Sequence, residues 1–170
     1  MGCENRVFSQ WYKGRPFQMN GRTYVTAEQY MMSEKALLFG DLKTYRAIME
    51  EPDPAKDKHL GRHVTPFDQE KWDAAVREIL FHGNLAKLQS DSEIVEALLD
   101  TGDSVLVEAS PLDAIYGAGV SKENLLDPAG KLLVHPRNWH TKDKPDVPAK
   151  NLLGFVLMGI RDLFKDLMGI

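Results

Sequence analysis

The chain has 170 residues, of which 43% are hydrophobic and 27% charged, a composition typical of globular proteins rather than disordered or fibrous ones. Its 21 Lys and Arg against 25 Asp and Glu give a net charge of −4, which argues against a protein that binds mainly by gripping a long nucleic-acid backbone. No apolar run approaches membrane-spanning length, and the single cysteine, Cys3, favours a reducing compartment. We therefore expect one cytoplasmic domain over residues 1–170, without membrane association.

The first predicted elements are a short hairpin and a helix. Asn20-Gly21 between apolar flanks is a strong hairpin signal, and Thr26 with a glutamine three residues later is a capping-box pattern that predicts a helix from that point. Glu28 then falls in the first turn, where an acid is either favoured by the helix dipole alone or held for a purpose. Lys35 shares roughly the same helical face as Glu28, which indicates a cleft lined by both charges.

Most of the remaining chain is predicted to be helical. Prolines and capping residues predict helices over 42–50, 53–62, 68–89, from 90 or 91 to about 102, and from about 151 onwards. Trp72 falls on the apolar stripe of the long helix, where it is a core residue or, alternatively, a platform for a nucleobase. Residues 120–149 are predicted to be an extended loop that acts as a functional cover or a mobile segment. The predicted fold class is α+β, a mostly helical single domain with a small β-sheet.

Residues 104–109 are predicted to form a strand that leads into a loop of small residues. Apolar side chains alternate onto both faces of this strand, which implies an interior position and places Glu108 near a buried end. The run Gly117-Ala118-Gly119 either lies against a ligand without side-chain obstruction or forms an ordinary turn, with Asp113 as a cap. A buried acid needs a partner, so Glu108 and Asp113 are both candidate functional residues.

Residues 56–63 form the most basic window of the chain. Arg62 in this window offers a planar fork to phosphate oxygens, although a solvated helix face with internal ion pairs is a slightly better explanation. His59 and His63 are four residues apart, but no further ligand lies at a suitable spacing, so we do not expect a metal site. Trp11 and Tyr116 are each either core residues or ring platforms.

Six short motifs, taken in chain order, resemble the NADAR family. They are Phe8-Ser9-Gln10-Trp11-Tyr12; Tyr24-Val25-Thr26-Ala27-Glu28-Gln29-Tyr30 with Lys35; Gly61-Arg62; Trp72; Glu108-Ala109-Ser110 with Asp113 and Tyr116-Gly117-Ala118-Gly119; and Lys150-Asn151-Leu152-Leu153-Gly154 with Met158 and Arg161. Each motif is weak alone. Their shared order over nearly the whole chain argues against coincidence.

The resemblance implies an N-glycosidase. Members of the family are described as cleaving the bond from ribose to nitrogen in early riboflavin-pathway intermediates, or as removing ADP-ribose from modified guanine bases. The family's catalytic glutamate falls on Glu28 and a functional tryptophan on Trp72, while a second acid falls on either Glu108 or Asp113. Tyr116 stands where the family usually has tryptophan, and Gln10 replaces a commoner asparagine, so contacts to base and ribose are expected to differ.

Cleaving a ribose C1–N bond builds positive charge on the sugar, which a nearby carboxylate such as Glu28 would stabilise while activating a water. The second acid would protonate the leaving base, as paired carboxylates divide the work in other glycosidases. Lys35 is expected to hold phosphate or to orient Glu28. The further expected substrate-binding residues are Arg62, Gly61, Trp11, Tyr12, Tyr116, Gly117, Gly119 and Asn151.

This scheme requires no metal or organic cofactor. The expected partner is a ribose phosphate or an ADP-ribose adduct, either free or carried on DNA or RNA, and the oligomeric state is left open. A binding module that recognises ADP-ribose without turnover is the main alternative, and it would not need Glu28. A protein that only mediates interactions is the third alternative, and it would lack a closed pocket.

Overall fold

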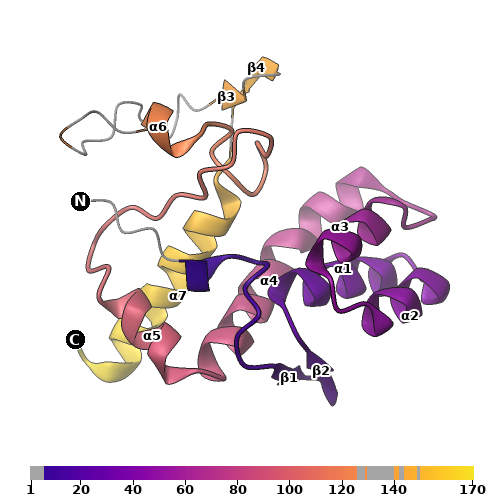
Figure 1. Ribbon diagram of the computed structural model, residues 1–170, viewed down its shortest axis with the longest axis horizontal. Coiled ribbons are helices and arrows are strands. Elements are labelled where there is room, and N and C mark those ends of the chain that lie inside the picture. Colours follow the sequence, from indigo (N-terminus) through magenta and orange to yellow (C-terminus); the bar gives the residue numbers. More distant parts are fainter. Residues whose placement is uncertain (1–5, 126–128, 130–139, 142–143, 149) are drawn as a thin grey trace. The chain divides into compact units, whose positions relative to one another are not determined.

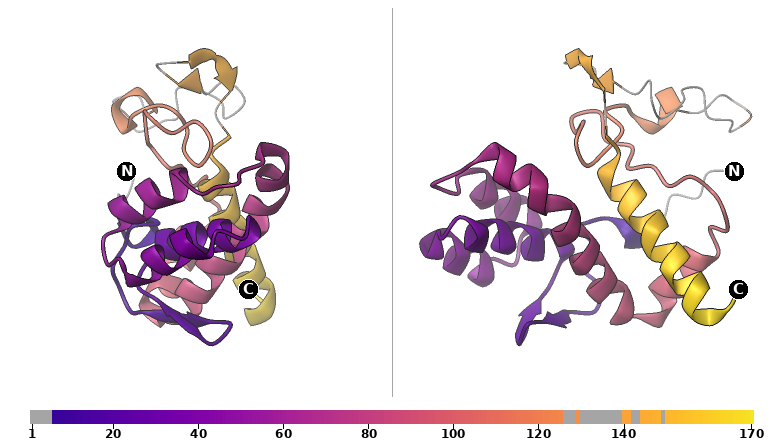
Figure 2. Two further views of the ribbon diagram at one scale, coloured as in Figure 1. Left: turned by 90° about the vertical axis from the view of Figure 1, so that its right-hand side faces the viewer. Right: turned by 180° about the vertical axis from the view of Figure 1, so that it is seen from behind.

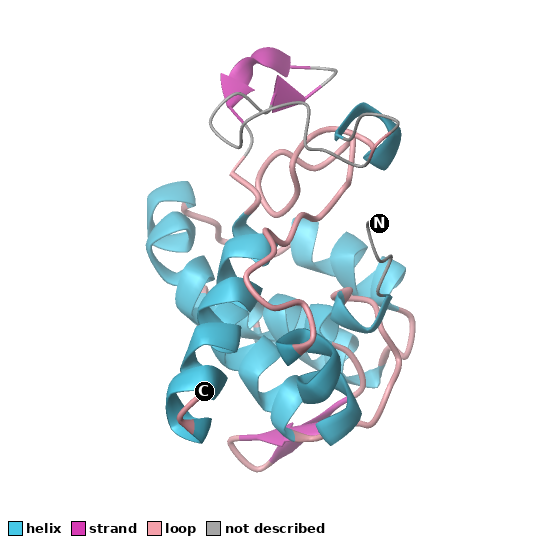
Figure 3. Cartoon of the chain, turned by 90° about the vertical axis from the view of Figure 1, so that its left-hand side faces the viewer, coloured by secondary structure: helices cyan, strands magenta, loops and turns pink. Residues whose placement is uncertain are grey.

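A computed structural model describes residues 6–125, 129, 140–141, 144–148 and 150–170. The chain divides into two compact units, an N-terminal unit of residues 5–100 and a C-terminal unit that includes residues 101–170. Helices dominate the described part, together with two small antiparallel hairpins (Figures 1 and 3). The expected mostly helical α+β class is confirmed.

The N-terminal unit begins with the short 3-10 helix η1 (Arg6–Phe8) and the predicted hairpin, formed by β1 (Phe17–Met19) and β2 (Arg22–Tyr24). Asn20 and Gly21 both have positive φ, 52° and 74°, which is the backbone that a two-residue hairpin turn of matching twist requires. The register places Phe17 opposite Tyr24. These two rings pack with Tyr30, whose ring meets Tyr24 edge-on at 5.1 Å between centroids, so the hairpin is anchored by aromatic packing.

Three helices follow: α1 (Ala27–Leu38), α2 (Leu42–Glu50) and α3 (Pro54–Arg62). Thr26 caps α1 as predicted, because its hydroxyl accepts a hydrogen bond from the Gln29 amide at 3.1 Å. Asp41 and Asp53 cap the next two helices through the amides of Thr44 and Ala55. Helix α1 packs against both α2 and α3 (Figure 2), and its own residues are buried over most of its length.

The long helix α4 (Gln69–Gln89) and the shorter α5 (Ser92–Leu99) complete this unit. Asp68 and Asp91 cap them by accepting hydrogen bonds from main-chain amides. Helix α4 lies against α1 and β1 and buries Trp72, Val76 and Leu80 on one stripe. The predicted helices over 68–89 and 42–50 agree with the observed bounds, whereas α5 ends three residues before the expected Gly102.

The C-terminal unit contains α6 (Lys122–Leu125), the hairpin of β3 (His140–Thr141) and β4 (Lys144–Pro148), and the long helix α7 (Leu152–Met168). Helix α7 buries Leu153, Val156, Leu157 and Ile160, which lie on one apolar stripe of the predicted helix. Its buried Arg161 donates hydrogen bonds to the Thr101 hydroxyl and the Ser104 carbonyl, at 2.7 and 2.9 Å. That side chain therefore fixes the start of the unit on its last helix.

The predicted strand at 104–109 is wrong, since this segment belongs to no sheet. Val105 is 51% exposed, so the interior position expected from the apolar alternation is also wrong. The physical reason is that the backbone of this segment forms hydrogen bonds with the Asn151 side chain instead of with a second strand. An alternating pattern of apolar residues is compatible with a strand, but it does not show that a partner strand is present to pair with it.

The expected extended loop at about 120–149 contains regular structure in its described parts, because α6 and the β3–β4 hairpin both lie within it. The remaining residues of that prediction, 126–128, 130–139, 142–143 and 149, lie outside the described residues, as does Cys3. In the part of the chain that is described, no helix combines the length and the apolar character needed to cross a bilayer.

Candidate active site

Glu28 lies in the first turn of α1 and is 3% exposed. Its amide donates a hydrogen bond to the Gln10 carbonyl at 3.0 Å, so the segment before β1 is fixed against the start of the helix. Gln10 is itself buried, and its side-chain amide lies 4.0 Å from the Met31 sulfur. The sequence predicts an acid at a helix start, and the structure adds that this acid is enclosed.

The neighbouring Gln29 holds this helix start in place. Its side-chain amide donates to the carbonyls of Ile48 and Glu51 at 3.0 and 3.1 Å, and its side-chain oxygen accepts from the Val25 amide at 3.0 Å. The capping glutamine is thus also a connector from α1 to the end of α2. Because the residue is buried, these bonds satisfy polar atoms that would otherwise destabilise the core.

Lys35 and Trp72 lie together in the N-terminal unit. The Lys35 ammonium is 5.3 Å from the centroid of the Trp72 ring and 4.4 Å from that of Phe67, distances at which a cation is attracted to a ring face. Partial burial lowers the pKa of Lys35. Trp72 is only 5% exposed, so its ring is mainly a core surface that positions Lys35.

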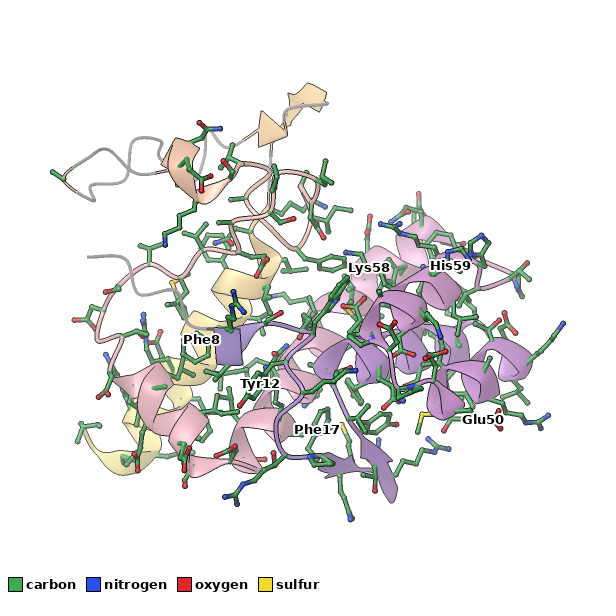
Figure 4. The ribbon with its side chains drawn as sticks, viewed as in Figure 1. Phe8, Tyr12, Phe17, Glu50, Lys58 and His59 are labelled. Carbon is green, nitrogen blue, oxygen red and sulfur yellow. The ribbon has the colours of Figure 1, made fainter. Side chains whose placement is uncertain are left out.

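Gly61 is buried near the end of α3 because α3 packs closely on α1. A Cβ atom added at Gly61 would collide with the Met32 side chain, which explains glycine at this position by helix packing. The next residue, Arg62, is exposed. Lys58 and His59 lie on the same helix (Figure 4). The basic window is therefore a surface feature that leaves Arg62 accessible to an anion.

The two histidines of this window, His59 and His63, interact with each other. His63 Nδ1 lies 2.8 Å from the His59 carbonyl, and the two rings are 4.4 Å apart. Among the residues that the structure describes, no three His, Cys, Asp or Glu side chains gather as metal ligands would.

Trp11 and Tyr12 lie in the segment between η1 and β1, where Figure 4 labels Tyr12. Trp11 is 45% exposed and Tyr12 is partly buried. Tyr12 lies near Lys87 of α4, whose ammonium is 5.5 Å from the Tyr12 ring centroid and donates to the Ser9 carbonyl at 2.8 Å. Lys87 is 4% exposed, and burial lowers its pKa to about 7.

Asp57 is a further buried ionisable residue of this unit. It lies in the first turn of α3, is 0% exposed, and neither carboxylate oxygen has a hydrogen-bond partner within the described residues. Burial, together with the carboxylates of Glu51, Glu28 and Asp53, raises the pKa of Asp57 to about 7, while Lys13 acts in the opposite direction. A carboxylic acid that retains its proton near neutral pH therefore lies in the electrostatic field of Glu28.

Asp57 and Lys87 are absent from the sequence prediction, although each has a signal in the sequence. Lys87 continues the stripe of Trp72, Val76, Leu80 and Gly83, whose members are three or four residues apart, and Asp57 lies one turn before Gly61. A charged residue on a buried stripe is the observation that identifies both.

In the C-terminal unit, Asp113 accepts hydrogen bonds from the amides of Ile115 and Tyr116 at 3.1 and 2.9 Å. It is the predicted turn cap, and its side chain is fixed in direction. Its carbonyl also accepts from the Gly119 amide at 3.1 Å. Glu108 is partly buried, and its carbonyl accepts from the amides of Ser110 and Ala118 at 2.9 and 2.8 Å. Residues 108–119 thus form a closed, internally bonded loop.

Asn151 ties this loop to α7. It is 0% exposed with a left-handed backbone, φ 45°, which asparagine tolerates better than most residues. Its side-chain amide donates to the Leu106 carbonyl at 2.9 Å, its side-chain oxygen accepts from the Glu108 amide at 3.0 Å, and its main-chain amide donates to the Gly117 carbonyl at 3.0 Å. Asn151 therefore orders the loop, and its expected contact with a substrate stays a prediction.

Two glycines make that arrangement possible. A Cβ atom at Gly117 would lie 2.8 Å from the Asp113 carbonyl oxygen, and one at Gly154 would collide with the Leu106 carbonyl oxygen. Gly119 has φ 68°, a conformation that favours glycine. Gly117, Gly119 and Tyr116 are thus grouped in one turn, as predicted.

The predicted site residues fall into two sets, one in each unit. Those of the N-terminal unit are Glu28, Lys35, Trp72, Gly61, Arg62, Trp11 and Tyr12; those of the C-terminal unit are Glu108, Asp113, Tyr116, Gly117, Gly119 and Asn151. The N-terminal set supplies a buried carboxylate and cations, and the C-terminal set supplies a rigid loop that carries two acids.

The NADAR domain model matches residues 2–165 of the chain. An N-glycosidase of Acanthamoeba polyphaga mimivirus is 39% identical over 160 residues, which cover 92% of this chain and 86% of that protein. N-glycosidase YbiA of Escherichia coli is 25% identical over 155 residues, with 91% and 77% covered. The NMR structure of the E. coli protein YbiA matches with a TM-score of 0.70 at 22% identity, covering 95% of this chain and 79% of that one.

Proposed function

This chain belongs to the NADAR domain family and is an N-glycosidase, and we propose that it hydrolyses the bond between ribose C1 and a nucleobase nitrogen. The proposed substrates are an ADP-ribose adduct of guanine, free or in DNA or RNA, and a phosphoribosyl-amino-pyrimidine of riboflavin biosynthesis. The absence of any disulfide-forming cysteine pair in the sequence supports a place for this reaction in the cytoplasm.

The observation that carries the proposal is the enclosed Glu28 carboxylate at the start of α1. As the C1–N bond breaks, the ribose gains oxocarbenium character, and a carboxylate in a low-dielectric setting stabilises that charge far better than one in water. The same carboxylate accepts a proton from the attacking water, whose oxygen bonds to C1. The products are the free sugar and the free base.

The leaving nitrogen needs a proton, which the second acid supplies. Asp113 and Glu108 are both candidates. Two main-chain amides hold the Asp113 side chain in one direction, and a fixed proton donor loses less freedom in the transition state. We therefore favour Asp113 over Glu108 for this step.

The proposed binding contacts are cations and aromatic rings. Exposed Arg62 suits a phosphate or diphosphate. Lys35 adds a partly desolvated cation that Trp72 and Phe67 position. Exposed Trp11, with Tyr12 and Tyr116, offers ring faces for a base. The glycine turn at 117–119 lets a ligand approach the backbone, and Asn151 keeps that turn in shape.

The test is to incubate the purified protein with ADP-ribosylated guanine, as mononucleotide and in an oligonucleotide, and with the aminopyrimidine ribotide, and to follow the free base by chromatography. We expect the wild type to release base from one of these substrates. The variant Glu28→Gln should lose about 100-fold or more in kcat, because the charge that stabilises the transition state is lost.

The matched control is Glu70→Gln, which makes the same change in the first turn of α4 and should leave kcat unchanged. If the wild type binds ADP-ribose but releases no base from any substrate, the protein is a binding module and the proposal is wrong. Equal kcat values for Glu28→Gln and wild type would remove Glu28 from the mechanism.

A further inference from the structure

Asp57 has a combination of properties that packing does not explain. It is completely buried, neither carboxylate oxygen has a hydrogen-bond partner within the described residues, and it occupies the face of α3 that also carries the buried Pro54 and Gly61. An unbonded carboxylate in such a place costs several kcal/mol when it is charged. An apolar residue would fill the same space without that cost. We therefore infer that the carboxyl group of Asp57 has a function other than packing.

The surroundings of Asp57 indicate which function. Helix α3 packs against α1, and Glu28 and Asp57 each lie in the first turn of their helix. Four charged groups act on Asp57: Glu28 from α1, Glu51 from the α2–α3 connection, Asp53 from its own cap, and Lys13 from the segment before β1. Three of the four are acids, so a second negative charge at this point is strongly disfavoured.

We propose that Asp57 is a positioning residue for Glu28: as a buried neutral acid it keeps the proton of the pair, so that Glu28 alone carries the negative charge. This inference rests on the proposed function, in which Glu28 is the catalytic carboxylate. Two acids that share one apolar region hold a single charge between them. The proton resides on Asp57 because it is the fully buried member and because, among the residues that the structure describes, it receives no hydrogen bond that would stabilise its ionised form.

The consequence is an alkaline limit on activity. When Asp57 ionises, its charge repels Glu28 and disfavours the packing of α1 against α3, so the geometry around Glu28 loosens. The raised pKa of Asp57, about 7, sets the position of this limit. In the wild type, kcat/KM should fall above neutral pH, about tenfold per pH unit for a single ionisation.

The decisive variant is Asp57→Asn, which keeps the shape of the side chain but cannot ionise. We expect it to retain wild-type kcat/KM at pH 6 and to lack the decline above pH 7, so that it exceeds the wild type about tenfold or more at pH 8.5. If Asp57 had a purely structural role, the variant would change kcat/KM at all pH values and keep the decline above pH 7, which is called the alkaline limb. An identical alkaline limb in Asp57→Asn and wild type would overturn the proposal.

Two neighbours give graded controls. Lys13→Gln removes the cation that favours ionised Asp57 and should shift the limb to higher pH. Asp53→Asn removes an acid that opposes ionisation and should shift the limb to lower pH, while asparagine still caps α3. Shifts in the reverse directions, or none, would show that another group sets the limb.

A spectroscopic measurement separates this inference from the proposed function. The infrared carbonyl band of a protonated carboxyl should be present in the wild type at pH 6, absent from Asp57→Asn, and lost from the wild type above pH 8. Its absence at pH 6 overturns the proposal whether or not any substrate is turned over. If the band is present but the wild type hydrolyses nothing, the proposed function is wrong and the positioning role fails with it.

Discussion

The two units fix their functional groups by different physical means. In the N-terminal unit, charged side chains are enclosed among helices: Glu28, Asp57 and Lys87 are each at most 4% exposed, and two of them have strongly shifted pKa values. In the C-terminal unit, a loop is fixed by hydrogen bonds from Asn151 and Asp113 to its backbone. In the first unit burial shifts the pKa values of charged groups, and in the second unit hydrogen bonds to the backbone fix the positions of side chains.

The difference predicts where the molecule is least tolerant of added volume. Gly154→Ala should destabilise the protein by about 3 kcal/mol or more, because the new methyl group meets a main-chain carbonyl and the Asn151 side chain, neither of which is free to move away. Gly61→Ala is the control in the other unit and should cost less, since it meets the flexible Met32 side chain. Thermal unfolding measures both, and equal losses would contradict the comparison.

Loss of the asparagine that orders the loop is expected to be almost as severe. Asn151→Ala removes two buried side-chain hydrogen bonds. It also places alanine at φ 45°, a backbone conformation that alanine tolerates less well than asparagine. Together these changes should reduce the free energy of unfolding by about 2–4 kcal/mol. Asn151→Gly removes the same bonds but tolerates the backbone, so it should be about 1 kcal/mol less destabilising. Chemical denaturation checks the order, and a glycine variant less stable than the alanine variant would contradict it.

The buried acid of the N-terminal unit should reduce stability as pH rises. The folded-state pKa of Asp57, about 7, is above its ordinary value of 3.8, so between these values the folded state binds more protons than the unfolded state and stability falls with increasing pH. Asp57→Asn should therefore be more stable than the wild type at pH 8, by about 1–3 kcal/mol, and similar near pH 4. The measurement is the free energy of unfolding of both proteins by chemical denaturation from pH 4 to pH 8. A wild type that is less stable than Asp57→Asn at pH 4 but equally stable at pH 8 would contradict the prediction.

The buried lysine predicts the opposite slope at higher pH. The pKa of Lys87 is lowered from 10.5 to about 7, so between these values the unfolded state binds more protons and stability rises with pH. Lys87→Met should remove this rise, and at pH 6 it should be about 1 kcal/mol more stable than the wild type despite losing the hydrogen bond to Ser9. The measurement is the difference in unfolding free energy between pH 7 and pH 10, which must shrink in the variant.

The smallest effect concerns a local cap. Thr26→Ala removes the side-chain acceptor for the Gln29 amide and should cost about 1 kcal/mol. Asp41→Ala at the start of α2 is the matched control, expected to cost somewhat more because Asp41 also accepts from the Thr65 amide at 3.1 Å. Equal destabilisation by the two variants would show that the second bond contributes nothing.

Much of the candidate site could be predicted because its secondary structure depends on helix capping, turn residues and helical periodicity, which are local features of the sequence. Thr26 as cap, Asn20-Gly21 as hairpin and Trp72 on a buried stripe depend on neighbours within one turn or one loop. The placement of Glu28 at a helix start follows from the same local signal. The resemblance of motifs in order identified the family, which the match over residues 2–165 confirms.

What the sequence by itself determined, then, is the six longer helices, the caps at Thr26 and Asp68, the first hairpin and the chemical type of the enzyme. The tertiary structure decided that 104–109 is not a strand, because an asparagine 43 residues after Glu108 supplies the hydrogen bond that a neighbouring strand would make. It also decided that Asp57 and Lys87 are buried. The helical spacing places both residues on stripes of buried positions, but which element covers each stripe depends on packing between elements distant in the sequence, as does the long-range hydrogen bond of Asn151.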